Sequence, residues 1–195
     1  IGSLWKLLTA LLIKLCCACE TNDTHGRHKM ALDLETRRQL IETVRRFVNE
    51  VCRPNEQLVS ETNAIPDKIV QEMKDLGLFG LSISEDYGGL GLTMEEEALV
   101  ILEMGRTSPA FRSTFGTNVG IGSQGIVMFG NDDQKNEWLP KLATGEAIAS
   151  FALTEPGAGS DLQAMSASAQ RDGDHYLLNG SKTFVTSGLQ ADLVI

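Results

Sequence analysis

The spacing of hydrophobic residues changes near Glu146, and this change divides the 195-residue sequence into two parts of different predicted structure. Before Glu146, apolar residues recur every three or four positions, which is typical of helices that bury one face. After it, the periodicity shifts toward two, which is typical of strands. We therefore expect an α+β protein, with an N-terminal all-α helical bundle over residues 30–145 and the start of an antiparallel β-barrel or sandwich domain over residues 146–195.

The helical part contains several recognisable helix ends. Asp33 is placed to cap a first helix that Pro54 should stop, because proline lacks the N–H that a helix interior needs. A second helix carries Pro66 in its first turn and ends at Gly77, which follows the usual preference for proline at the start and glycine at the end. Residues 78–83 are then expected to be extended.

Two further helices are predicted from capping signals. Thr93 and Glu96 have the spacing of a capping box, in which each side chain binds the other residue's backbone N–H. The helix that follows, over residues 94–105, is expected to turn four residues toward the core: Ala98, Ile101, Leu102 and Gly105. Asn131 with Gln134 offers a second cap, for a helix that ends at Gly145.

Residues 120–125 match the pattern G-x-G-x-x-G of dinucleotide-binding loops. Such a loop must follow a buried strand and open a helix of several turns. Residues 115–119 are not a buried-strand run, and only residues 126–129 remain before Gly130 breaks the chain. The sequence therefore predicts a buried helix in which small residues allow close packing.

The strands after Glu146 are predicted from alternation and turn residues. Asn179-Gly180 is the strongest hairpin signal among them. Five strands are expected: residues 148–153, 166–170, 175–178, 182–186 and 191–195. Because the last one reaches the end of the sequence, the chain is expected to be truncated.

The segment Phe151–Asp161, with the sequence F-A-L-T-E-P-G-A-G-S-D, passes from apolar residues into a glycine-rich turn. Glycine lets backbone N–H groups approach a ligand closely, while Thr154 and Ser160 supply hydroxyl groups. This composition is compatible with a loop that receives a phosphate or a planar cofactor, and equally with a surface turn between two strands.

Residues 152–164, A-L-T-E-P-G-A-G-S-D-L-Q-A, resemble the signature of the acyl-CoA dehydrogenase family. The triplet F-V-T at residues 184–186, which follows L-N-G-S-K, resembles the family's second flavin-contacting strand. The runs G-L-F-G-L at residues 77–81 and E-D-Y-G-G-L-G-L at residues 85–92 resemble the link between the second and third helices of its N-terminal domain. The resemblance covers nearly everything after Met30.

The resemblance implies FAD as the cofactor and a set of residues beside it: Phe151, Ala152, Leu153, Thr154, Gly159, Ser160, Phe184, Val185 and Thr186. It also implies that Ser160 contacts the acyl-CoA substrate. The Thr186 hydroxyl suits a hydrogen bond near flavin N5, where negative charge develops. Phe184 replaces the tryptophan of many members, and Ser187 replaces a common asparagine.

The implied reaction is α,β-dehydrogenation of an acyl-CoA thioester in fatty-acid or branched-chain catabolism, with electrons passed to an electron-transferring flavoprotein. In the family the proton-abstracting glutamate belongs to a C-terminal helical domain, so no catalytic residue is expected in this sequence. Glu155 and Asp161 are expected to fix the loop by an ion pair or by accepting N–H groups. The alternatives are a non-catalytic FAD- or acyl-CoA-binding module and an oxidase-like or nitroalkane-type flavoprotein of the same fold.

The net charge of −9 argues against a nucleic-acid partner. Three cysteines lie at residues 16–19 and only Cys52 lies in the body, which predicts no disulfide framework and a reducing compartment. The cluster of those three cysteines with His25 and His28 misses the usual zinc spacings, so no metal site is expected. Residues 1–29 have an atypical composition and are interpreted as upstream reading frame or a partial-sequence artefact.

The resemblance further implies a homo-oligomer, a dimer or a tetramer, when the protein is full length. We expect a bacterial cytoplasmic protein, with the mitochondrial matrix as the alternative location.

Overall fold

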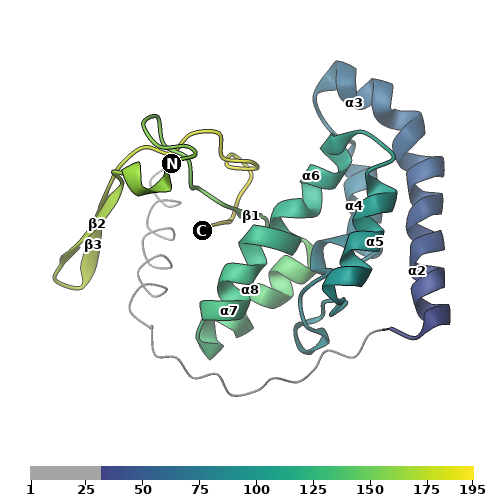
Figure 1. Ribbon diagram of the computed structural model, residues 1–195, viewed down its shortest axis with the longest axis horizontal. Coiled ribbons are helices and arrows are strands. Elements are labelled where there is room, and N and C mark those ends of the chain that lie inside the picture. Colours follow the sequence, from purple (N-terminus) through teal and green to yellow (C-terminus); the bar gives the residue numbers. More distant parts are fainter. Residues whose placement is uncertain (1–31) are drawn as a thin grey trace.

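The computed structural model describes residues 32–195, and Figure 1 shows the helices gathered on one side and a β-hairpin on the other. The helices are Leu34–Phe47 (α2), Glu56–Thr62 (α3), Asp67–Asp75 (α4), Met94–Met104 (α5), Pro109–Thr117 (α6), Ser123–Phe129 (α7) and Asp132–Thr144 (α8). The strands are Ala149–Ser150 (β1), Ser168–Asp172 (β2), His175–Asn179 (β3) and Leu193–Val194 (β4). The predicted α+β class, a helical bundle followed by a partial β region, is confirmed. The N-terminal cysteine and histidine cluster lies outside the described residues.

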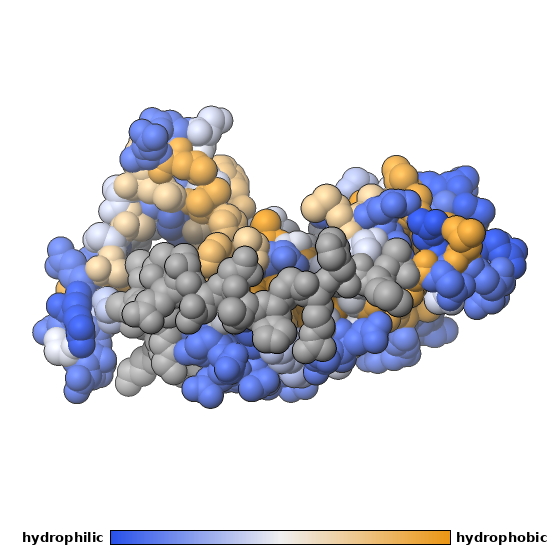
Figure 2. Space-filling view, turned by 60° about the horizontal axis from the view of Figure 1, so that its bottom comes forward, coloured by the Kyte–Doolittle hydropathy of each residue, from blue (hydrophilic) through white to orange (hydrophobic). Residues whose placement is uncertain are grey.

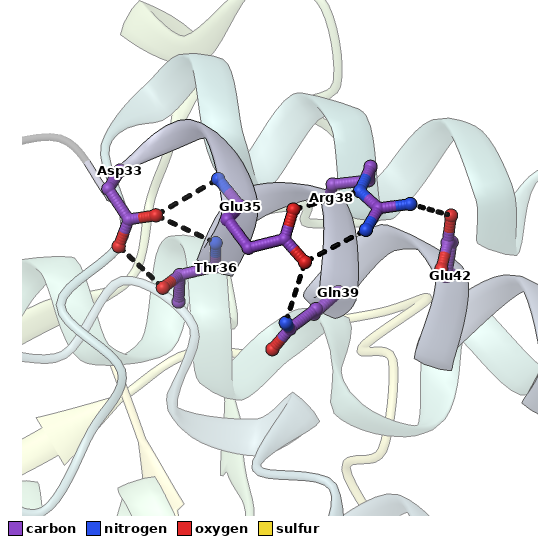
Figure 3. Close-up of polar contacts among 6 residues, drawn as sticks. All are labelled: Asp33, Glu35, Thr36, Arg38, Gln39 and Glu42. Carbon is purple, nitrogen blue, oxygen red and sulfur yellow. Dashed lines mark hydrogen bonds and ion pairs between the residues drawn. The ribbon is translucent and has the colours of Figure 1, made fainter.

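Helix α2 begins at the predicted cap, Asp33 (Figure 3). Its carboxylate accepts hydrogen bonds from the backbone N–H groups of Glu35 and Thr36, at 2.9 and 3.0 Å, and from the Thr36 hydroxyl. The Thr36 side chain is the main reason that the pKa of Asp33 lies below its ordinary value. Arg38 pairs with Glu35 and with Glu42 along the exposed face, where such pairs contribute little to stability.

Pro54 does not stop this helix, contrary to the prediction. The chain continues through a π-helical turn, Val48–Cys52, and a 3₁₀ turn, Arg53–Asn55, into α3. Arg53 N–H donates to the carbonyl of Val48, five residues back. This change of hydrogen-bond register comes directly before Pro54, so the missing proline N–H falls at the start of a 3₁₀ turn.

Helix α4 begins after Pro66 and is followed by Gly77 in the left-handed conformation (φ 71°), as predicted. The expectation of an extended segment at residues 78–83 was wrong. Leu78–Gly80 is a 3₁₀ turn, and the apolar side chains of this run are fully buried. The run is apolar because it lies in the core, and a short continuous apolar stretch does not distinguish a strand from a buried turn.

Helix α5 has the predicted capping box of Thr93 and Glu96, but of the predicted core face only Ile101 packs against the core. Val100 and Met104 are buried, whereas Leu102 is 68% exposed. Ala98 and Gly105 are exposed as well.

Two buried glutamates of α5 explain this rotation. Glu96 accepts hydrogen bonds from Thr93 and from the backbone N–H of Leu32, and Glu103 pairs with Arg45 and Arg106. Because each carboxylate has polar partners, the helix can turn these residues inward.

Residues 118–129 are helical, as predicted, except at a kink at Gly120, whose backbone dihedral angles are not helical (φ −91°, ψ −106°). A π-helical turn, Asn118–Gly122, joins α6 to α7. A Cβ added at Gly122 would lie 2.3 Å from the Ala149 Cβ and 2.5 Å from the Thr117 carbonyl oxygen. Only glycine allows β1 to approach the helix this closely.

The second capping box, Asn131 with Gln134, is also present and begins α8. Gly145 ends α8 in the left-handed conformation, again as predicted. Pro140 lies within this helix.

The β region is less regular than predicted. β2 and β3 form an antiparallel hairpin, whereas β1 pairs with β4 in parallel. The predicted strand over residues 148–153 is reduced to Ala149–Ser150. Asn179-Gly180 does not turn the chain into a strand at residues 182–186. That segment binds the loop after β1 instead, for example through Thr183 N–H and the Thr154 carbonyl at 2.9 Å.

The buried apolar residues form two clusters. The first fills the helical bundle and includes Phe79 and Phe115, whose rings meet edge to face with centroids 6.3 Å apart. The second joins the bundle to the β region, since it contains Leu139 of α8, Ala149 of β1 and Leu193 of β4. Within residues 32–195, no helix has the length and apolar character needed to cross a bilayer.

Candidate functional site

A cavity of about 410 Å³ lies where α6 meets the loop after β1. Its size is that of a small-molecule site. Figure 2 shows hydrophobic residues exposed on either side of a hollow in the outline of the molecule. The helical wall of the cavity consists of Arg112, Ser113, Gly116, Thr117, Gly120 and Ile121. The loop wall consists of Phe151, Leu153, Thr154, Phe184 and Thr186.

The loop wall contains residues from both segments that the sequence analysis selected. Phe151, Leu153 and Thr154 come from the segment after β1, and the triplet at residues 184–186 contributes Phe184 and Thr186. The remaining predicted cofactor-binding residues do not line this cavity: Ala152, Gly159, Ser160 and Val185. Gly159 and Ser160 lie further along the same loop, where both are exposed.

Lys182 and Glu155 hold the two segments together. Lys182 Nζ donates to the Leu153 carbonyl oxygen at 3.0 Å and to Glu155 Oε1 at 2.9 Å. Glu155 also accepts hydrogen bonds from the backbone N–H and hydroxyl of Ser166 and from the N–H of Ala167. The Glu155 side chain is only 2% exposed, whereas the Lys182 side chain is 28% exposed and Ser166 and Ala167 lie at the surface.

These contacts lower the pKa of Glu155 to about 2. The Ser166 N–H makes the largest contribution, followed by Lys182. A carboxylate with four donors and so low a pKa is ionised and already bound, which makes it a poor general base. Glu155 has the contacts of the expected structural role, and Asp161 likewise caps the 3₁₀ turn Leu162–Ala164 through the N–H of Gln163.

Two more hydrogen bonds fix the triplet beside the cavity. Ser150 Oγ donates to the Thr186 carbonyl oxygen at 2.6 Å, and Thr183 N–H donates to the Thr154 carbonyl oxygen. Between them, Phe184 has a left-handed backbone (φ 55°) and a side chain that is 94% exposed. A non-glycine residue in this conformation costs about 1–2 kcal/mol, and such residues gather at functional sites.

The helical wall was not identified from the sequence. Gly116 and Gly120 were assigned to a closely packed helix, but a Cβ added at Gly120 would meet nothing within 4 Å. A Cβ added at Gly116 would lie 2.7 Å from Arg112 Nη1, so this glycine makes room for the guanidinium. The only signal was the four-residue spacing of Arg112, Gly116 and Gly120, which places them on one helix face.

The cavity fits part of a flavin by its chemistry. An exposed phenylalanine ring at its rim can lie against a planar aromatic group. The two threonines, Thr154 and Thr186, supply hydroxyl groups for the polar edge of that group. Among residues 32–195, no three or more His, Cys, Asp or Glu side chains are grouped so as to hold a metal ion.

Sequence comparison matches residues 34–146 to the acyl-CoA dehydrogenase N-terminal domain and residues 150–195 to the acyl-CoA dehydrogenase middle domain. These matches cover most of the chain. It therefore belongs to the acyl-CoA dehydrogenase family.

Relatives and solved structures agree with this assignment. The bovine mitochondrial isovaleryl-CoA dehydrogenase is 37% identical over 163 residues, which are 83% of this chain and 38% of the bovine protein. A glutaryl-coenzyme A dehydrogenase in complex with glutaryl-CoA has a TM-score of 0.78 and 37% identity over 85% of this chain and 43% of its own. A Bacillus anthracis acyl-CoA dehydrogenase complexed with FAD has a TM-score of 0.75 and 36% identity over 84% and 28% of the two chains. The chain thus spans about two-fifths or less of the length of these proteins.

Proposed function

We propose that this chain supplies the N-terminal and middle-domain part of an FAD-dependent acyl-CoA dehydrogenase. The observation that carries the proposal is the meeting of two segments distant in sequence, at Phe151–Thr154 and at Phe184–Thr186, along one wall of the cavity. Both segments resemble the flavin-contacting segments of the family, and the similar Bacillus anthracis enzyme is one that was solved with FAD.

In this proposal the loop wall would hold FAD, which would supply the acceptor for the hydride that leaves the β-carbon of the thioester. Phe151 and Phe184 would cover its ring, and backbone groups near Leu153 and Thr154 would bind its pyrimidine edge. The Thr186 hydroxyl would donate a hydrogen bond near N5 and so stabilise negative charge there. Ala152 and Val185 support these residues from within their segments.

The thioester occupies the space between the two walls. Ser160, on the exposed part of the loop after Glu155, contacts the CoA ester, and Gly159 gives that loop its close approach to the cofactor. The α-proton is removed by a glutamate of the family's C-terminal helical domain. The proposal also divides the chain into two domains, the N-terminal helical domain at residues 30–145 and the start of the middle β-domain at residues 146–195.

Electrons then pass to an electron-transferring flavoprotein, and the working protein is a homo-oligomer, either a dimer or a tetramer. Its location is the bacterial cytoplasm, with the mitochondrial matrix as the alternative. These features follow from the family resemblance.

The test uses the FAD-loaded full-length enzyme, which carries the C-terminal helical domain with its glutamate, with and without Thr186→Val. We expect the variant to retain FAD, measured by its visible absorbance after gel filtration, but to be reduced more slowly by acyl-CoA under anaerobic conditions. Normal reduction kinetics would contradict the role of Thr186. FAD binding without any acyl-CoA-dependent bleaching in the unmodified protein would favour a binding module, and oxygen consumption in place of electron transfer to a flavoprotein would favour an oxidase.

A further inference from the structure

Helix α5 presents a stripe of apolar residues to solvent, although the side that it buries carries two glutamates. Met94 and Leu102 are the large members of this stripe, and they are 88% and 68% exposed. Ala98 and Gly105 are the small members and are also exposed. Because a helix turns about 100° per residue, all four residues lie within about 80° of one another around its axis. We call this set the α5 stripe.

The α5 stripe serves neither the core nor the candidate cofactor site. Within residues 32–195, α5 packs against α2 and α6 (Figure 1). It does so through its opposite side, where four residues are buried: Glu96, Val100, Glu103 and Met104. No residue of α5 is among those that line the described cavity. Contiguous exposed apolar residues with a charged border are typical of protein–protein contacts.

The α5 stripe is complementary to itself in shape when two copies of the helix lie antiparallel. With Val100 at the centre of the contact, Leu102 of one copy faces Ala98 of the other. Met94 then faces Gly105. Each pair places a large side chain against a small residue, so the ridges of one helix fit the grooves of the other. A two-fold axis generates both pairs twice, as a contact between identical chains requires.

The charges at the border of the stripe match in the same arrangement. Glu95 and Arg106 border the stripe on the same side at its two ends, and their side chains are 76% and 53% exposed. An antiparallel pair places Glu95 of one copy beside Arg106 of the other. Within one chain these two residues are about 16 Å apart along the helix axis, too far to pair with each other. Each already pairs within its own chain, with Arg37 and with Glu103 respectively, and a carboxylate or guanidinium can bind a second partner.

We propose that the α5 stripe is a contact surface between two copies of this chain, related by a two-fold axis near Val100. The inference rests on the proposed function only for the expectation of a homo-oligomer, and it needs neither FAD nor a thioester. Stable complexes bury about 1,200–2,000 Å² in total, and a single pair of short helices lies at or below the lower end of this range. The contact alone should therefore give a weak, concentration-dependent dimer.

The first test places a charge in the stripe and measures self-association of the full chain by sedimentation velocity over a range of concentrations. We expect a reversible monomer–dimer equilibrium in the unmodified chain. Leu102→Glu should raise the dissociation constant at least about tenfold, because its carboxylate would be buried against the second copy. Leu177→Glu makes the same change at an exposed leucine of β3 and should leave the constant unchanged. Because both leucines are exposed, both variants should keep the melting temperature of the unmodified chain.

The second test exchanges the charges at the border. Glu95→Arg and Arg106→Glu should each raise the dissociation constant about three- to tenfold, because each brings like charges together between the copies. The double variant should recover the constant of the unmodified chain within about twofold. An equimolar mixture of the two single variants should also associate as tightly as the unmodified chain, since every contact then joins opposite charges. Only a second copy as the partner produces this recovery.

Four results would overturn the inference. Three concern this chain: a monomer at every concentration, a dimer that Leu102→Glu does not weaken, and a double variant that does not recover association. The fourth is a monomeric full-length enzyme whose melting temperature falls in Leu102→Glu, which would mean that the C-terminal helical domain covers the stripe. Flavin bleaching by acyl-CoA is measured on the same full-length enzyme. Normal bleaching without self-association would contradict this inference alone, whereas self-association without bleaching would contradict the proposed function alone.

Discussion

The two walls of the cavity are held in place by different forces. The helical wall belongs to α6, whose other face buries Phe111 and Phe115 in the core of the bundle. The loop wall has almost no regular structure and is fixed by hydrogen bonds of Lys182, Glu155 and Ser150. Burial of apolar area does not depend on the ionisation of any side chain, whereas the ion pair of Lys182 with Glu155 depends on pH and is weakened by salt. We therefore expect the two walls to fail under different perturbations.

The largest effect is expected from the core behind the helical wall. Phe115→Ala removes a fully buried ring that packs on Phe79, which should cost about 3–5 kcal/mol of unfolding free energy. Urea denaturation of the FAD-free protein measures this loss. Phe129→Ala, which truncates a ring that is 63% exposed, is the matched control and should change the free energy much less. Equal losses would mean that burial does not hold this wall.

The second prediction concerns acid and the loop wall. The pKa of Glu155 is about 2, against an ordinary value of 4.5, so its ionised form is favoured by folding. This contribution is complete above pH 4.5 and is lost as the pH falls through about 2. In Glu155→Gln the contribution is absent at every pH. The difference in melting temperature from the unmodified protein should therefore be largest above pH 4.5 and shrink toward pH 2.

Glu95→Gln is the control for that experiment, because the Glu95 side chain is 76% exposed and pairs with Arg37 on the surface. A constant difference between Glu155→Gln and the unmodified protein from pH 6 to pH 2 would show that the network does not depend on the charge of Glu155.

The third prediction separates folding from cofactor binding. Lys182→Met removes the link between Leu153 and Glu155, while Glu155 keeps its bonds to Ser166 and Ala167. We expect the loop wall to loosen and the dissociation constant of FAD to rise about tenfold, which corresponds to about 1.4 kcal/mol. Fluorescence titration measures this constant. Lys68→Met, which removes a distant surface pair with Glu72, should leave it unchanged.

The smallest effect is expected at Ser150. Ser150→Ala removes one neutral hydrogen bond to the Thr186 carbonyl, worth about 1 kcal/mol. Hydrogen exchange should show faster exchange at residues 182–188 and unchanged exchange in α6. Faster exchange in both segments would mean that the walls move together, and the contrast between them would be lost.

The parts of the fold that followed from the sequence are those set by local chemistry. The two capping boxes begin α5 and α8 as expected, because a cap depends on two residues three positions apart. Leu102 was wrongly predicted to face the core because hydrophobic periodicity treats charged residues such as Glu96 and Glu103 as exposed. Both glutamates are buried, and their partners come from distant segments or from beyond the helix. Residues 78–83 were misplaced because a fully buried run carries no periodicity.

In the site, too, one part could be predicted from local sequence and the other could not. The loop wall could be found from its glycine-rich motif and the resemblance that motif carries. Arg112 and Ser113 have the composition of an ordinary exposed helix face, and only the packing of the turn after α6, Asn118–Gly122, against β1 brings them to the cavity. The contacts of Lys182 also join residues far apart in sequence, so no local pattern could indicate them.

The side chain of Asn118 links the helical part of the molecule to β1. Its side-chain nitrogen donates to the carbonyls of Leu142 and Ala147, and its oxygen accepts the N–H of Ala149. This one fully buried amide follows directly after α6 and holds the strand from which the opposite wall departs. Together with the close contact of Gly122 with Ala149, this carboxamide therefore helps to fix the distance between the two walls. Because Asn118 does not line the cavity, an exchange of the lining side chains leaves its three hydrogen bonds in place.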